Sequence, residues 1–206
     1  AAATGAEGGG AALSERTLLS LATWVREAEG SVPLAALCAH PMVSFAVGCL
    51  DSGDEAVLYG AVEALCEVMR TTTPTVSGLP VTEAEGFAGG LLGKAVALGP
   101  RFVALRDEAS RGEVGSEDEA KSLARLIVEA GDTYFELVAR GSPDACRFVA
   151  AVLEINAHPD DAICSMTYNF WQRLAGAITD PGRAVFEDDG PASPPPGGSA
   201  APPPPP

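Results

Sequence analysis

The chain has 206 residues and a formal charge of −15, with 28 acidic residues against 13 lysines and arginines. Such an acidic excess argues against direct nucleic-acid binding, which needs clustered cations for the phosphates. It suits a basic protein partner, and the alternative is that it only keeps an alanine-rich protein soluble. Apolar residues make up 47% of the sequence and aromatic residues 6%. The apolar residues are mostly Ala, Leu and Val, which favour closely packed helices over a sheet.

The N-terminal residues 1–12 (AAATGAEGGGAA) carry few side chains that could be buried, and we expect them to be disordered. They show no basic segment followed by an apolar core, so no secretory signal is predicted. A first helix is predicted from Leu13 to about Ala28. Its apolar face consists of Leu18, Leu21, Ala22 and Val25, with Trp24 beside it.

The uncharged stretch Ser31–Leu50 admits two interpretations. It is long enough to cross a bilayer, but Pro33 and the pair His40-Pro41 divide it into short pieces. We therefore favour the partner of the first helix, entered or broken at His40-Pro41, and we expect no membrane association.

A second helix pair is predicted after Leu50. Ser52 and Glu55 have the spacing of a capping box, and the apolar stripe that follows continues to Arg70. After a loop, the partner helix begins at about Thr82, and Gly99-Pro100 should kink or end it. We interpret four glycines in this helix as sites of close approach between helices: Gly86, Gly89, Gly90 and Gly93.

A third pair begins with another capping-box pattern, Ser116 and Glu119. The long stripe that follows contains Leu123, Ile127, Ala130, Tyr134 and Leu137, and Gly141 should end it. A short partner helix is predicted over Asp144–Ile155. The residues expected on its inner face are Phe148, Val149, Val152 and Leu153.

The clearest single helix is predicted over His158–Ile178 (HPDDAICSMTYNFWQRLAGAI). Pro159 suits a first helical position, and two aspartates, Asp160 and Asp161, complement the unpaired amides of a first turn. The apolar positions recur at steps of three and four, which predicts one stripe along about five turns. Phe170 and Leu174 should be buried and Trp171 at least partly buried.

The helix starts near residues 14, 54, 117 and 160 recur at about 40 residues, with an insertion before Ser116. This spacing predicts an all-α fold: an α-solenoid of HEAT-type antiparallel helix pairs in a right-handed superhelical stack, a fragment of about 3–4 repeats over residues 13–178. Residues 179–206 form a proline-rich tail that we expect to be disordered. The alternative is that it serves as a polyproline ligand for a small domain with an aromatic groove.

No pattern predicts a catalytic, cofactor-binding or metal-binding residue. Five cysteines are widely spaced inside apolar helical patterns, which favours buried free thiols: Cys38, Cys49, Cys66, Cys146 and Cys164. His40 and His158 each precede a proline, where helix capping is the ordinary role. The acidic clusters 117–119 and 187–189 lack the spacing of a metal loop. We expect no enzyme, although a small all-α enzyme stays an alternative because catalytic groups can be distant in sequence.

The run Tyr168–Leu174 (YNFWQRL), preceded by His158-Pro159, resembles a HEAT-repeat helix of the importin-β (karyopherin-β) family, and most closely its transportin-SR and importin-13 subgroup. The run Leu21–Val25 (LATWV) and the pair Glu55-Ala56 resemble the same family more weakly. The resemblance covers about Leu13–Ile178, and neither end of the chain.

The resemblance implies a nuclear transport receptor that shuttles between nucleus and cytoplasm. Its implied partners are protein cargo, with arginine/serine-rich splicing factors for this subgroup, a Ran-type GTPase and nuclear-pore proteins. No partner-binding residue can be carried over by motif, and import cannot be told from export. The alternative is a HEAT- or armadillo-type interaction scaffold unrelated to nuclear transport.

Overall fold

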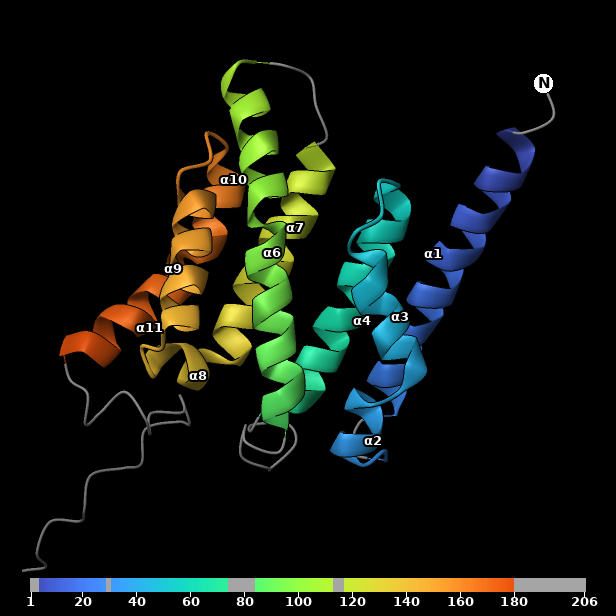
Figure 1. The fold of residues 1–206 in the computed structure, drawn as a ribbon, viewed down its shortest axis with the longest axis horizontal. Helices are drawn as coiled ribbons and strands as arrows, with labels where there is room; N and C mark the ends of the chain where they lie inside the picture. The colour runs from blue at the N-terminus through green and yellow to red at the C-terminus, as the bar shows by residue number, and fades with distance from the viewer. Residues whose placement is uncertain (1–3, 29–30, 74–83, 113–116, 180–206) are drawn as a thin grey trace, which may run out of the picture.

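A computed structural model describes residues 4–28, 31–73, 84–112 and 117–179, and in these ranges every regular element is a helix (Figure 1). In chain order the elements are α1 (Thr4–Glu27), α2 (Leu34–Cys38), α3 (Pro41–Cys49), α4 (Glu55–Thr72), α6 (Glu85–Ser110), α7 (Glu117–Thr133), α8 (Phe135–Ala139), α9 (Pro143–Asn156), α10 (Asp161–Cys164), the 3-10 turn η2 (Ser165–Thr167) and α11 (Tyr168–Thr179). The all-α prediction is confirmed for this part of the chain. The predicted disorder of residues 180–206 lies outside the described residues.

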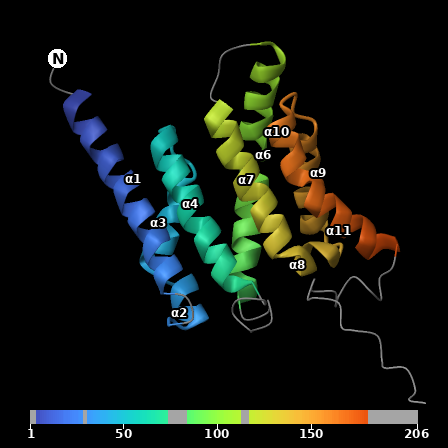
Figure 2. The ribbon, with the colours of Figure 1, turned by 180° about the vertical axis from the view of Figure 1, so that it is seen from behind.

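The helices form two layers. One layer contains α1, α4, α7 and α11, each beside the next, and the other contains α3, α6 and α9. Figure 1 looks onto the layer of α3, α6 and α9, and Figure 2 onto the layer of α1, α4, α7 and α11. Across the layers α3 packs on α4, and α6 and α9 pack on α7. This stack of antiparallel helix pairs is the predicted solenoid.

Helix α4 lies in the centre of the core because α1, α3 and α7 all pack against it. Twelve of its 18 residues are buried. At its last turn the hydroxyls of Thr72 and Tyr134 share a hydrogen bond of 2.8 Å, and both side chains are buried. An unpaired buried hydroxyl would cost about 1–3 kcal/mol. This bond therefore makes a tyrosine acceptable at the buried junction of α7 and α8.

Two glycines allow neighbouring helices to approach closely. A Cβ added to Gly60 in α4 would lie 3.1 Å from Cβ of Leu18 in α1. A Cβ added to Gly131 in α7 would lie 2.9 Å from Cε1 of Phe148 and 3.1 Å from Cδ2 of Phe170. Since the two rings belong to α9 and α11, Gly131 is the point where three helices meet.

The glycines of α6 do not have this role, and their predicted contact with neighbouring helices is wrong. A Cβ added at any of the four would meet nothing within 4 Å, and all four positions are exposed: Gly86, Gly89, Gly90 and Gly93. They leave part of the α6 backbone open on the outside of the stack.

The boundaries of the first two long helices differ from the prediction. Helix α1 already begins at Thr4, before the predicted start at Leu13, and the predicted disorder of residues 1–12 stays a prediction. Helix α4 is capped by Asp54, whose Oδ1 accepts a hydrogen bond from the Val57 amide at 3.1 Å. The predicted cap Ser52 instead accepts from the Asp54 amide at 3.0 Å and so positions the actual cap.

Helix α6 does not end at Gly99-Pro100 but continues through Pro100 to Ser110. The proline removes one backbone hydrogen bond. Leu98 and Phe102 are both buried, one on each side of it, and their packing holds the helix on the stack across the proline. The break predicted at His40-Pro41 is confirmed, because α2 ends before His40 and α3 begins at Pro41.

The helix predicted over His158–Ile178 is divided into α10, η2 and α11. The buried Thr167 hydroxyl donates to the carbonyl of Cys164, three residues earlier, at 2.8 Å, which suits the tighter 3-10 turn. Phe170 is buried and Trp171 partly buried, as predicted, whereas Leu174 is only partly buried. The sequence period continues through the turn, and this is why it did not reveal the break.

Two burial predictions on α9 are wrong. Leu153 is 53% exposed, although it was expected on the inner face, because the inner face runs through Phe148, Val152 and Ile155. Cys146 is exposed rather than buried. All five cysteines are free as predicted, but only Cys66 is buried, and Cys38, Cys49 and Cys164 are partly buried.

Helix α6 has the length and apolar composition of a membrane span. Its residues Leu91, Ala95 and Leu98 are nevertheless buried in the stack, where the helix packs on α7 and α9. The stretch weighed as a span from the sequence, Ser31–Leu50, is divided between the short helices α2 and α3.

Candidate partner-binding surface

Arg101 joins three segments of the stack. Its Nε donates to Glu119 of α7 at 2.6 Å, and its two terminal nitrogens donate to the carbonyls of Leu50 at 3.2 Å and Ser52 at 2.8 Å. These carbonyls lie just after α3. Because one guanidinium pairs with an acid and two main-chain acceptors, it fixes α6 against both α7 and the end of α3. Glu119 is thus a partner of Arg101, and its predicted capping partner Ser116 lies outside the described residues.

Ion pairs also connect the helices of the first layer. Arg26 of α1 reaches Glu67 of α4 at 2.5 Å, and Arg125 of α7 pairs with Glu63 of α4. Burial alone would raise the pKa of Glu67, but hydrogen bonds from Arg26 and Arg70 outweigh it and hold that pKa below its usual value. Glu63 and Glu67 of α4 are therefore each paired with an arginine of a neighbouring helix.

Glu129 and Asp132 on α7 are less well satisfied. Burial raises the pKa of both carboxyls, and the Asp132 charge raises that of Glu129 further. Oδ1 of Asp132 is buried without a hydrogen bond, and Arg173 of α11 lies 3.7 Å from it. A hydrogen bond with Asn169 partly offsets the effect of burial on the Asp132 pKa.

A candidate binding groove lies on the second layer, between α6 and the α8–α9 segment, with a volume of about 590 Å³. Helices α6 and α9 come together near Gly99, where an added Cβ would lie 3.9 Å from Cβ of Ala151. Closer to the start of α6, the exposed Gly89 and Gly93 form part of one wall. Apolar side chains line much of its centre: Leu92, Val96, Leu137, Val138 and Phe148.

Charged side chains surround this apolar surface. Arg140 at the end of α8 pairs with Glu85 at the start of α6, and Arg147 pairs with Asp144 within α9. Asp144 and Arg147 are largely exposed, at 81% and 69% of their side chains. An apolar centre with a polar rim is the usual anatomy of a protein-binding surface.

The structure separates the residues that could have carried catalysis. His40 is the N-cap of α3, and its Nδ1 accepts from the Met42 amide at 3.2 Å. The capping role predicted for His40 is therefore confirmed, and the one predicted for His158 is wrong. His158 accepts from the Asp160 amide at 3.1 Å, and Asp160, not Pro159 or His158, is the N-cap of α10. Burial lowers the pKa of His158 and raises that of the Cys66 thiol to about 12, which disfavours its thiolate. Within the described ranges no three His, Cys, Asp or Glu side chains form a potential metal site.

Sequence reasoning missed the groove and the role of Arg101. The glycines of α6 were a usable signal, since their spacing of three and four residues places them together on one helix face. Their exposure could not be read from that spacing, because the same pattern serves close helix packing. Arg101 carries no signal in the sequence, as its partners are far from it in the chain.

Stacked helix pairs of this kind define a helical-repeat protein. Comparison with known proteins specifies the family. The family model described as "Transportin-3/Importin-13 second TPR domain" matches residues 116–187. Transportin MOS14 of Arabidopsis thaliana is 30% identical over 172 residues, which cover 81% of this chain and 16% of that protein. The uncharacterized protein C11G11.07 of Schizosaccharomyces pombe is 28% identical over 158 residues, which cover 76% of this chain and 14% of that protein.

A search of the solved structures found no significant match to the chain. The chain belongs to the importin-β family of transport receptors, in the group that contains transportin-3 and importin-13. It spans about one sixth of the length of the curated relatives that it matches.

Proposed function

We propose that this chain acts in nucleocytoplasmic transport, as a segment of a receptor that binds protein cargo and shuttles between nucleus and cytoplasm. The observation that carries the proposal is the match to transportin MOS14 over 81% of the chain. The receptor does no chemistry of its own: binding and release of cargo are controlled by the GTP-bound form of a Ran-type GTPase. Nuclear-pore proteins are its further partners.

The groove between α6 and α8–α9 is the surface that we assign to a partner. Its apolar residues supply buried area, and the missing side chains of Gly89 and Gly93 allow a partner to approach the α6 backbone. The net charge of −15 attracts a basic partner over several ångströms of solvent, and salt weakens that attraction. Arginine/serine-rich splicing factors are the cargo with this chemistry.

The test is a pull-down of an arginine/serine-rich domain by the protein, with and without the GTPase locked in its GTP form, at low and high salt. An importer should release the domain when the GTPase is added, an exporter should bind it more tightly, and salt should weaken either complex. Binding that ignores the nucleotide state would place the protein in the alternative class, a HEAT- or armadillo-type scaffold unrelated to nuclear transport.

A groove-filling variant tests the surface separately. Gly93→Leu places a side chain in the groove and should weaken binding of the partner. Ala104→Leu adds comparable bulk at an exposed position of the same helix and is the matched control. Equal binding by both variants would remove the groove from the proposal and leave the transport function standing.

A further inference from the structure

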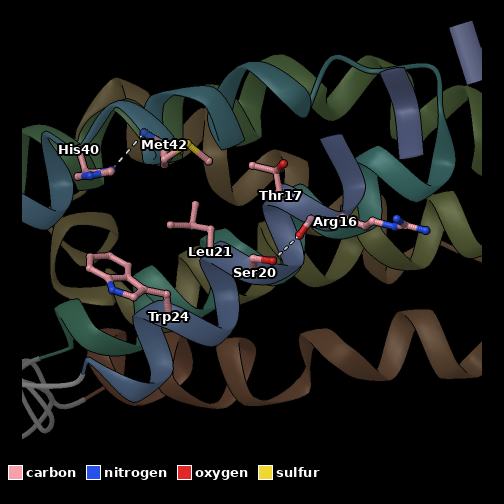
Figure 3. Close-up of a pocket in the computed structure, with 7 residues that line it drawn as sticks. All are labelled: Arg16, Thr17, Ser20, Leu21, Trp24, His40 and Met42. Carbon is pink, nitrogen blue, oxygen red and sulfur yellow. Dashed lines mark hydrogen bonds between the residues drawn. The ribbon is translucent and has the colours of Figure 1, made fainter. Parts of the chain in front are cut away.

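A second pocket lies at the other end of the molecule, between α1 and the start of α3 (Figure 3). Its volume is about 430 Å³. The residues that line it are Arg16, Thr17, Ser20, Leu21 and Trp24 on α1, and His40 and Met42 at the start of α3. It shares no residue with the groove on α6, so what it binds is independent of the transport proposal.

Arg16 differs from the other cationic side chains of the described residues because its guanidinium has no ion pair. In this acidic chain every other lysine and arginine that the structure describes has a hydrogen bond or ion pair. Arg16 has none with any side chain of the described residues. Figure 3 shows Trp24 and His40 at one end of the pocket, and the Arg16 side chain extending away from them beyond the other end. An unpaired guanidinium presents a fork of donors that suits a carboxylate.

The opposite end combines an aromatic surface with a donor. The rings of Trp24 and His40 lie 5.9 Å apart between centroids and are tilted by 35°, and the indole is 44% exposed. Nδ1 of His40 is an acceptor, because it receives the Met42 amide. The proton of the neutral ring therefore lies on Nε2, which can donate to a ligand. An aromatic ring placed on Trp24 would remove exposed apolar surface from water.

Between the two ends the wall of α1 offers acceptors. The Thr17 hydroxyl donates to the Leu13 carbonyl at 2.8 Å, and the Ser20 hydroxyl donates to the Arg16 carbonyl at 2.7 Å. Since both protons are engaged, the hydroxyl oxygens have only lone pairs left for a ligand. Such acceptors suit the N–H groups of a peptide backbone.

The spacing of the two ends limits the ligand. The Cα atoms of Arg16 and Trp24 are eight residues apart on one helix, which is about 12 Å along its axis, and the Arg16 side chain extends further away from Trp24. At about 3.3 Å for each residue, an extended peptide needs at least four residues to cover that distance. We propose that this pocket binds an extended, acidic segment of a partner protein, with an aromatic side chain on Trp24 and a carboxylate four or more residues away on Arg16.

A basic segment fits the pocket poorly despite the net charge of the chain. A lysine or arginine would meet the Arg16 charge at one end and the Nε2 proton of His40 at the other. The local arrangement of donors therefore selects an anion, and the overall acidity lowers the rate of encounter without changing which groups pair.

The experiment is a fluorescence-anisotropy titration of the whole chain with a labelled peptide, Gly-Ser-Phe-Gly-Ser-Asp-Asp-Gly. Saturable binding is expected, and replacement of the phenylalanine by alanine or of the aspartates by lysine should each abolish it. Arg16→Gln and Trp24→Ala should each weaken binding about tenfold or more. Exposed Arg111→Gln and Phe45→Ala remove the same charge and a similar ring elsewhere, and they should bind as the wild type does.

Circular dichroism establishes that each variant is folded. If Trp24→Ala does not fold, Arg16→Gln carries the test alone, because its side chain supports no described contact. The proposal is overturned if the peptide does not saturate the protein, if Arg16→Gln binds it unchanged, or if the lysine peptide binds more tightly.

Discussion

Glycine has two opposite structural roles in this protein, and only the surroundings of each residue distinguish them. Gly131 lies between α7, α9 and α11, where the rings of Phe148 and Phe170 leave no room for a methyl group. Gly93 lies on the exposed wall of α6, where a methyl group would meet nothing.

Alanine at these two positions should therefore change stability in opposite directions. Gly131→Ala should lower the free energy of unfolding by about 1–3 kcal/mol, because the buried rings must shift to admit the Cβ. Gly93→Ala should raise it by about 0.5–1 kcal/mol, since alanine restricts the unfolded chain and favours helix. Urea unfolding of both variants measures the two changes. A loss of stability at Gly93 would show that its surroundings are closer than the structure has them.

Glu129 provides a prediction that depends on pH. Its pKa in the folded state is raised above the unfolded value, first by burial and then by the charge of Asp132. The folded protein thus binds this proton more readily than the unfolded chain. Stability should rise as the pH falls through the raised pKa, and above it the protein bears the cost of the buried charge.

Glu129→Gln should accordingly stabilise the protein at neutral pH. The gain should shrink as the pH approaches the ordinary glutamate pKa of about 4.3, because wild-type Glu129 is then protonated as well. Urea titrations across this pH range give the two free energies. The exposed Glu136→Gln removes the same formal charge and serves as the control. If both variants gain equally at every pH, the effect comes from net charge and not from the surroundings of Glu129.

At the scale of the element, Arg101 determines how α6 sits on the rest of the stack. Arg101→Met keeps most of the apolar stem but removes the bonds to Glu119 and to the carbonyls of Leu50 and Ser52. Hydrogen bonds to charged groups contribute about 1.5–3 kcal/mol each in favourable settings. We expect a loss of about 2–4 kcal/mol, less than half of the sum over the three bonds, because the freed carbonyls can bind water.

The matched control is Arg147→Met, whose ion pair with Asp144 lies within α9 and is largely exposed. Such pairs contribute about 0–1 kcal/mol. Thermal or urea unfolding compares the two variants directly, and similar losses would mean that Arg101 does not join the elements as described.

The sequence predicted elements better than it predicted their ends. The helical spacing of the apolar residues predicted the positions of α4, α7, α9 and α11, because each of these helices has one face that must be buried. Caps and breaks were less predictable. Asp54 and Ser52 are both good capping residues two positions apart, and at Pro100 the packing of α6 outweighed the local cost of proline. The 3-10 turn at Thr167 depends on a side-chain bond that no periodicity reveals.

At the scale of the whole molecule, the solenoid and the family followed from spacing and from the YNFWQRL run, and the comparisons confirm the family. The candidate surfaces did not follow. A groove arises where helices diverge, and the unpaired state of Arg16 depends on where all the acidic side chains end up. The groove and the unpaired state of Arg16 both depend on how the whole chain packs, so no local sequence pattern predicts them.

The layered stack also determines which helices should unfold locally before the others. Helix α11 lies at one end and contributes a single fully buried residue, Phe170, whereas α4 and α7 contribute twelve and nine. Because contacts join mainly nearest neighbours, one end can open while the middle stays intact. Amide protons of α11 should therefore exchange with deuterium far sooner than those of α4 and α7 in a mass-spectrometric time course. Uniform protection along the chain would instead describe a single cooperative block.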